Sequence, residues 1–132
     1  MRSTSGSSRH TLRLSSLLIA ALVGLLFSQA AHGAEKGFSS KVHATLADSD
    51  TYGGCVASIT MGSNPGLNCS TDSNGRAWVT FSCDGTYASP YIASKNFQQA
   101  QIAMLADRKL GIRVDDSSKQ GGLCFAYRTV LQ

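Results

Sequence analysis

Five stretches of the chain are predicted to be strands, most of them because apolar and polar residues alternate. In the first stretch, Val42, Ala44 and Leu46 fall on one face, while Lys41 and His43 fall on the other. Loops rich in Gly, Asn, Ser and Asp separate the stretches, as is typical of turns between strands. The predicted strands are 40–48, 55–61, 77–83, 110–116 and 123–131.

One stretch between the third and fourth strands has helical spacing instead. Its apolar residues recur at intervals of three and four, and Leu105 widens the stripe. Ser94 is predicted to cap the helix at its N-terminus, because a serine hydroxyl can accept a hydrogen bond from a free backbone N–H. The stripe consists of Ala93, Phe97, Ala100 and Met104.

The predicted order is therefore β-β-β-α-β-β. Five strands with a helix between the third and fourth are typical of the OB-fold, a small Greek-key barrel. We predict this all-β barrel with one helix, and the alternative is an open α+β sheet with the helix on one face. The strand count and the helix position favour the barrel.

The N-terminal part of the chain has the features of a secretory signal peptide. Arg2, Arg9 and Arg13 lie in a basic, serine-rich start, and an apolar run follows over 17–27. That run is shorter than the roughly 20 residues of a membrane span, and small residues follow it. We predict a signal peptide over 1–34, cleaved near residues 33–34, and a single domain over 35–132; an uncleaved anchor is the alternative.

Removal of the signal changes the charge of the chain. The whole sequence has a formal net charge of +4, with 12 Lys and Arg against 8 Asp and Glu. Three of those arginines lie in the signal, which leaves nine basic and eight acidic residues. A nearly neutral chain gives little support to nucleic-acid binding. The mature chain is predicted to have no membrane span and to be secreted or periplasmic.

All 4 cysteines lie outside the signal and are predicted to form two disulfides. The spacings match neither a redox C-x-x-C motif nor a common zinc site. If the second and third strands form a hairpin with Met61 opposite Ala77, Cys55 lies near Cys83. In an OB barrel the third and fifth strands run parallel, so their starts bring Cys69 near Cys124. The predicted pairs are Cys55–Cys83 and Cys69–Cys124.

No constellation of residues predicts catalysis, a metal site or a cofactor. His43 is the sole histidine after the signal, and its position in the alternation predicts a solvent-facing side chain. A catalytic triad would require this histidine. Asp115 and Asp116 precede a polar stretch and are predicted to lie in a hairpin turn. Asp48 and Asp50 allow the same interpretation.

The cysteine frame and the element order resemble the B subunits of AB5-type bacterial toxins, notably those of subtilase cytotoxin and typhoid toxin. The resemblance rests on Cys55 with Cys83 and on the helix-then-strand segment "FQQAQIAMLADRKLGIRV" over 97–114. It implies an exported OB-fold that forms pentameric rings and binds sialylated glycans. Thr51 occupies the position of that family's glycan-binding serine. The chain is also similar to small secreted bacterial proteins of unassigned role, through Cys69, Trp78 and a late cysteine.

These observations predict a secreted, non-catalytic binding module with a glycan or protein ligand, of the toxin B-subunit type. Asp50, Thr51 and Tyr52 are the candidate ligand-binding residues, since they offer acceptors, a hydroxyl donor and a ring on which a sugar can stack. The alternative is an exported structural or assembly protein of the bacterial envelope that forms oligomers through a sheet edge. A small hydrolase is the third hypothesis.

Overall fold

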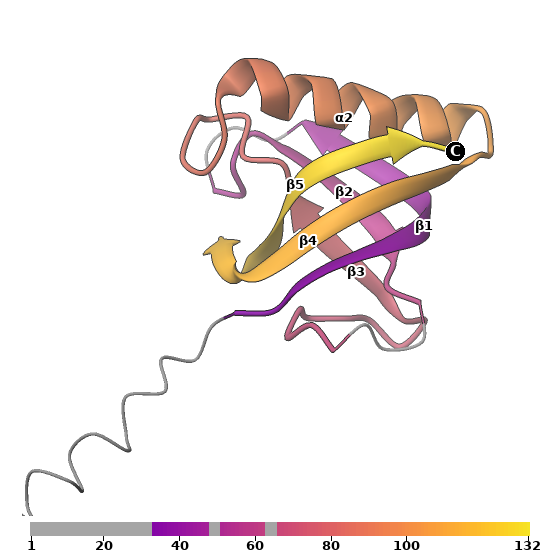
Figure 1. Cartoon of the computed structure of the whole chain (residues 1–132), viewed down its shortest axis with the longest axis horizontal. Coiled ribbons are helices and arrows are strands. Elements are labelled where there is room, and N and C mark those ends of the chain that lie inside the picture. Colours follow the sequence, from indigo (N-terminus) through magenta and orange to yellow (C-terminus); the bar gives the residue numbers. More distant parts are fainter. Residues whose placement is uncertain (1–32, 48–50, 63–65) are drawn as a thin grey trace, which may run out of the picture. The chain divides into compact units, whose positions relative to one another are not determined.

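The computed structural model describes residues 33–47, 51–62 and 66–132. Five strands and one helix account for most of these residues (Figure 1). The order of the elements confirms the predicted β-β-β-α-β-β arrangement. The elements are β1 (Glu35–Ala47), β2 (Cys55–Thr60), β3 (Arg76–Thr80), α2 (Pro90–Leu105), β4 (Lys109–Gln120) and β5 (Leu123–Leu131).

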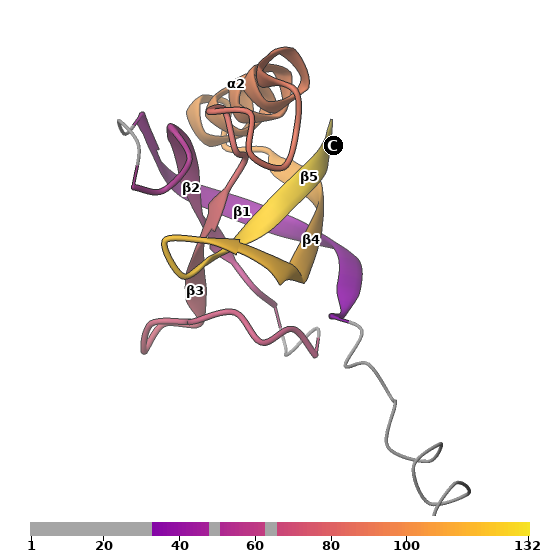
Figure 2. The same ribbon diagram turned by 90° about the vertical axis from the view of Figure 1, so that its left-hand side faces the viewer.

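The five strands close into a barrel in the order β1-β2-β3-β5-β4. All neighbouring strands are antiparallel except β3 and β5, which run parallel with Val79 opposite Cys124. Figures 1 and 2 show the strands crossing around a common interior, with α2 lying across one side of the barrel. This arrangement is the predicted OB-fold.

The interior of the barrel is filled by the apolar face of each strand. Leu46, which the alternation placed on the same face as Val42, is 49% exposed. A β-bulge between Val42 and Ala44 shifts the register of β1 against β2, and the bulge turns the end of β1 outward. The largest interior side chains are Ile59, Val79, Phe81, Leu110 and Val114.

Helix α2 packs small side chains against the barrel. Ala93, Ala100 and Ala103 are fully buried, and their size allows the helix backbone to approach the strands closely. The helix begins one turn earlier than predicted: Ser89, not Ser94, is the N-cap, and Pro90 follows it in the first turn. Proline is favoured there because its fixed φ suits a helix start. Within the described ranges, no helix is long and apolar enough to cross a membrane.

Both predicted disulfides are present. Their Cα–Cα distances are 5.7 Å for Cys55–Cys83 and 5.8 Å for Cys69–Cys124, within the usual range. The hairpin register differs from the prediction by two residues, because Ile59 rather than Met61 lies opposite Ala77. A shift of two residues preserves the facing of each side chain within the hairpin. Cys83 itself lies beyond the end of β3 and still bonds to Cys55.

The hairpin between β4 and β5 turns later than predicted. Asp115 and Asp116 lie within β4, which continues to Gln120. The turn consists of Gly121 and Gly122, with φ of +56° and +83°. Two consecutive residues with positive φ form the tight turn that suits a right-twisted hairpin, and glycine adopts them without strain. The serine-rich segment after Asp116 therefore extends the strand.

Candidate functional site

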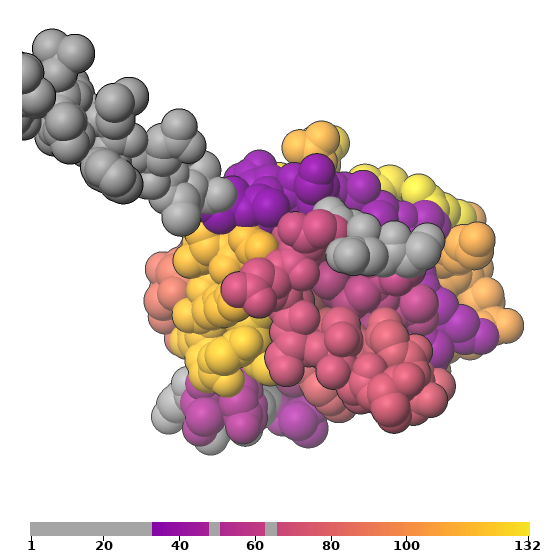
Figure 3. Space-filling view, turned by 90° about the horizontal axis from the view of Figure 1, so that it is seen from below, coloured from indigo at the N-terminus to yellow at the C-terminus, as the bar shows by residue number. Residues whose placement is uncertain are grey.

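Two adjoining hollows lie on the outer surface of the barrel where β2 and β3 meet the β4–β5 turn. Their volumes are about 310 Å³ and 280 Å³, and Trp78 and Leu123 line both. We call them together the Trp78 groove. Figure 3 shows the gold β4–β5 hairpin beside the pink segment that includes β3. The other lining residues are Leu46, Tyr52, Val56, Ser58, Ser70, Thr71, Asp72, Arg76 and Gly121.

Trp78 is at the centre of this groove because of the alternation along β3. Ala77 and Val79 point into the barrel and are almost fully buried, which directs the residue between them outward. Trp78 is 40% exposed. Ser58 lies directly opposite it on β2, and this small side chain leaves the indole uncovered on that side.

One half of the groove is apolar, and Tyr52 lies in it. The closest ring carbon of Tyr52 is 2.4 Å from where a side chain on Gly121 would begin, so the glycine makes room for the ring. Thr80 Oγ1 also donates a hydrogen bond of 2.7 Å to the Tyr52 carbonyl. Tyr52, which precedes β2, is thereby fixed against β3 and the β4–β5 turn. Leu46 and Leu123 complete the apolar half.

The other half of the groove is polar. Asp72 Oδ1 accepts backbone hydrogen bonds from Arg76 at 2.9 Å and from Asn74 at 2.8 Å. These bonds, chiefly the one from Arg76, lower the pKa of Asp72 below its ordinary value of 3.8 although partial desolvation opposes them. Ser70 and Thr71 add hydroxyl groups. This half therefore offers both donors and acceptors around neutral pH.

Of the two predicted ligand-binding residues that the structure describes, Thr51 and Tyr52, Tyr52 lines the groove. Thr51 is exposed beside it but lines neither hollow. Asp50 and Asp48 lie outside the described residues. Sequence reasoning missed Trp78 as a site residue, although its position between two inward-facing residues was a usable signal.

A hydrogen-bond network around Asp84 holds Gly53, the residue that follows Tyr52. Asp84 accepts hydrogen bonds from Ser82 Oγ at 2.9 Å, from Thr86 Oγ1 at 2.8 Å and from Gln120 Nε2. The backbone N–H of Asp84 in turn donates to the Gly53 carbonyl at 3.1 Å. Desolvation raises the pKa of Asp84, but the hydrogen bonds outweigh it and lower the pKa to about 2.

The lowered pKa of Asp84 predicts a loss of stability in acid. Because the folded pKa lies below the ordinary 3.8, the stabilisation is complete above pH 3.8 and is lost as the pH falls through about 2. We expect the Asp84→Asn variant to lose less stability than the wild type between these pH values in urea titrations. Asp107→Asn is the comparison: the hydrogen bond and charge of Lys41 also lower the pKa of Asp107, but this pair is largely solvent-exposed, so its effect on the pH slope should be smaller. An unchanged pH slope in Asp84→Asn would contradict the assignment.

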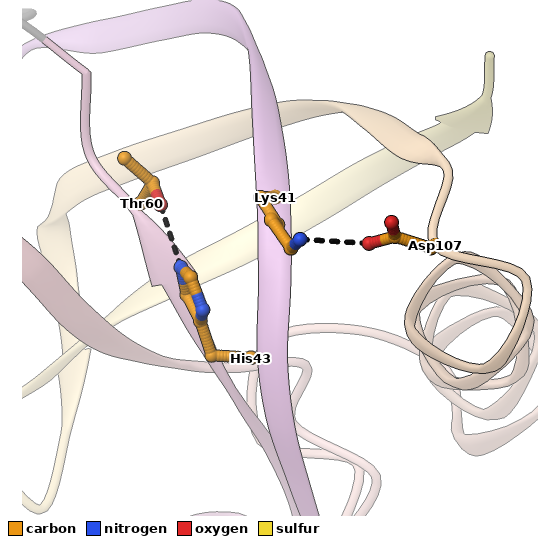
Figure 4. Close-up of polar contacts among 4 residues, drawn as sticks. All are labelled: Lys41, His43, Thr60 and Asp107. Carbon is orange, nitrogen blue, oxygen red and sulfur yellow. Dashed lines mark hydrogen bonds and ion pairs between the residues drawn. The ribbon is translucent and has the colours of Figure 1, made fainter.

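His43 lies apart from the groove, on β1, and is half-buried rather than fully solvated. Its Nε2 atom lies 2.7 Å from Thr60 Oγ1, and Figure 4 draws this contact together with the ion pair between Lys41 and Asp107. Desolvation, followed by the positive charges of Arg76 and Lys41, lowers the pKa of His43 below 6.5. The histidine is thus a cross-strand hydrogen-bonding residue between β1 and β2.

The two aspartates of β4 also have structural partners. Asp115 Oδ1 accepts from the N–H and the hydroxyl of Ser117, at 2.8 Å and 2.6 Å. Asp116 accepts backbone hydrogen bonds from Ala34 and Asn68, both at 2.6 Å. Among residues 33–47, 51–62 and 66–132, no group of three or more His, Cys, Asp or Glu is placed to hold a metal ion.

Comparison of the chain with known proteins identifies no relative. No family model matches it, and neither a curated protein nor a solved structure is significantly similar. Its function is therefore inferred from the fold and the groove.

Proposed function

We propose that this protein is an exported, non-catalytic module that binds a glycan in the Trp78 groove. The observation that carries the proposal is the exposed indole of Trp78 between an apolar and a polar half of one groove. An aromatic face suits the C–H surface of a sugar ring, and hydroxyls and charged groups suit its hydroxyls. In OB-folds the surface of the second and third strands, with the β1–β2 and β4–β5 loops, commonly binds oligosaccharides or oligonucleotides.

A saccharide fits this groove better than a nucleic acid. Single-stranded nucleic acids bind where several cations follow the backbone beside stacking aromatic residues. Arg76 is the one basic residue that lines the groove in the described part of the chain, and Asp72 lies next to it. One acid and one base beside an aromatic ring favour a neutral or weakly charged sugar.

Glycan-array screening of the oxidised mature protein tests the proposal. We expect selective binding to a subset of oligosaccharides, and loss of that binding when the disulfides are reduced. Reduction releases Cys69, next to Ser70 of the polar half, and Cys55, close to the loop that holds Tyr52. An array with no selective ligand at any concentration at which the protein stays folded would contradict the proposal.

Export is part of this proposal and predicts a defined N-terminus. Two disulfides are typical of a compartment outside the cytoplasm. We expect intact-mass analysis of protein recovered from the producing cells to show a chain that begins at Ala34 or Glu35. A mass that retains the residues from Met1 onward would contradict it.

A second candidate function is assembly into a homo-oligomer, as in the ring of a toxin B subunit or an envelope structure. Each strand of the closed barrel has neighbours on both sides, so the predicted contact through a sheet edge is not favoured. The exposed apolar residues of α2 favour assembly through the helix instead. Light scattering decides this: a stable oligomer supports it, and a monomer at all concentrations rejects it. The exposed apolar residues of α2 are Tyr91, Ile92, Ile102 and Leu105.

A further inference from the structure

A second groove, of about 510 Å³, lies over β1, β4 and the end of β5, away from Trp78. Arg113 of β4 and Arg128 of β5 both line it and are both exposed. The two arginines lie directly opposite each other in the ladder between these strands. Like charges in this position repel each other, and an arrangement of this kind is favourable when an anion lies between them.

A bulge in the strand pairing places Arg128 on the outer surface. Arg113 lies opposite Arg128, but the next residue of β4, Val114, lies opposite Ala126, so Tyr127 is the extra residue. Ala126 points into the barrel, and regular alternation would direct Arg128 inward as well. Bulges commonly reorient a side chain in this way. Here the bulge brings two guanidinium groups to the same face.

Two glycines provide the floor of this groove. A side chain on Gly37, opposite Arg113 on β1, would begin 3.3 Å from the Cγ atom of Arg113. A side chain on Gly111 would begin 2.9 Å from the amide nitrogen of Gln132. The absence of a side chain at Gly37 and Gly111 therefore leaves room for the side chains of Arg113 and Gln132 to lie across the sheet.

Three of the four polar side chains that line the groove offer a ligand hydrogen-bond donors: Arg113, Arg128 and Gln132. The hydroxyl of Ser39 donates to Gln132 Oε1 at 2.7 Å, so the amide N–H groups of Gln132 remain for a ligand. In the described ranges, neither the Arg113 nor the Arg128 side chain makes an ion pair or a hydrogen bond with protein atoms. Two acids lie on these strands near the arginines, and both have other partners. Glu35 on β1 accepts a hydrogen bond from Tyr127 Oη at 3.0 Å, and Asp115, two residues after Arg113 on β4, accepts from Ser117.

We propose that Arg113 and Arg128 together bind a tetrahedral oxyanion, the sulfate or phosphate group of an acidic ligand. Each guanidinium presents paired N–H donors that match two oxygens of such a group, and the Gln132 amide can add a further donor. The site is distinct from the Trp78 groove and does not depend on glycan binding there.

Titration of the ¹⁵N-labelled oxidised protein with sodium sulfate, and separately with sodium phosphate, tests this site. Sodium chloride at the same ionic strength is the reference, because it reproduces the screening of surface charges. We expect the arginine Nε–H signals of both residues and the backbone signals of Gly37 and Gly111 to move together. The expected dissociation constant is on the order of 1–10 mM for the isolated ion.

Substitutions distinguish a built site from general attraction to a basic surface. We expect Arg113→Gln and Arg128→Gln each to weaken binding at least about tenfold, since each removes half of the donors. Arg128→Lys keeps the charge but loses the paired donors, and it should also weaken binding. Lys95→Gln on α2 makes the same change of charge elsewhere and should leave binding unchanged. Equal shifts with chloride, or equal weakening in Lys95→Gln, would overturn the proposal, provided that circular dichroism shows the variants folded.

Discussion

Replacing both Cys69 and Cys124 with serine is expected to lower the free energy of unfolding by about 2–5 kcal/mol. The bond joins residues separated by 55 positions, so its removal frees a long loop in the unfolded chain. It also connects the segment before β3 to the start of β5, where only two residue pairs join these strands. Urea unfolding followed by far-UV circular dichroism measures the loss.

The other disulfide provides a matched comparison. Cys55 and Cys83 are separated by 28 positions, about half as many. Halving a flexible loop changes its closure free energy by about 0.6 kcal/mol, so the Cys55→Ser/Cys83→Ser variant should lose slightly less stability. A loss below about 1 kcal/mol for Cys69–Cys124 would contradict its role as the main crosslink of the barrel.

Replacing Trp78 with alanine is expected to weaken glycan binding by about 2 kcal/mol, or roughly 30-fold. The substitution removes the aromatic surface at the centre of the groove, where it contacts both halves. Because the side chain is 40% exposed and points away from the interior, the fold should tolerate its loss. Isothermal titration with the best ligand from the glycan array measures the change.

Leu105→Ala is the control for Trp78→Ala. Leu105 is 82% exposed at the end of α2 and lines neither hollow of the Trp78 groove. Its loss should leave binding unchanged, and Trp78→Phe should retain part of the affinity because it keeps an aromatic face. If Trp78→Ala folds and binds as the wild type does, the ligand binds elsewhere.

The fold could be predicted from the sequence because its main determinants are local. Alternation identified the strands, and the spacing of Ala93, Phe97 and Ala100 identified the helix. The order of these elements then favoured one closed topology, which brought the correct cysteines together. Disulfide formation could be predicted from the even number of cysteines and their spacing, which requires no knowledge of tertiary contacts.

Details that depend on contacts between strands were wrong. The register of the β2–β3 hairpin differed by two residues, because facing alone does not distinguish registers of the same parity. The bulge after Val42 exposed Leu46, and no local pattern marks that bulge.

The predicted start of the helix was also wrong. Ser94 resembled an N-cap, but Ser89 is the N-cap, and Pro90 after it begins the helix.

The candidate site could be predicted only in part. Tyr52 was predicted as a ligand-binding residue because its ring offers a surface on which a sugar can stack and because Cys55 lies next to its loop. The groove itself joins β1, β2, β3 and the β4–β5 turn, and Leu123 reaches it only after the barrel closes. The opposition of Arg113 and Arg128 likewise depends on a bulge in β5.

The central claim, that the ligand binds over Trp78, can be tested with the protein's own fluorescence. The sequence contains 1 tryptophan, so all indole emission comes from the groove. We expect acrylamide to quench the tryptophan fluorescence of the free protein, because the indole is partly exposed. Saturation with the glycan should shift the emission and reduce the quenching, with a midpoint equal to the dissociation constant from titration calorimetry. Saturating binding that leaves both the emission and the quenching unchanged would contradict the claim.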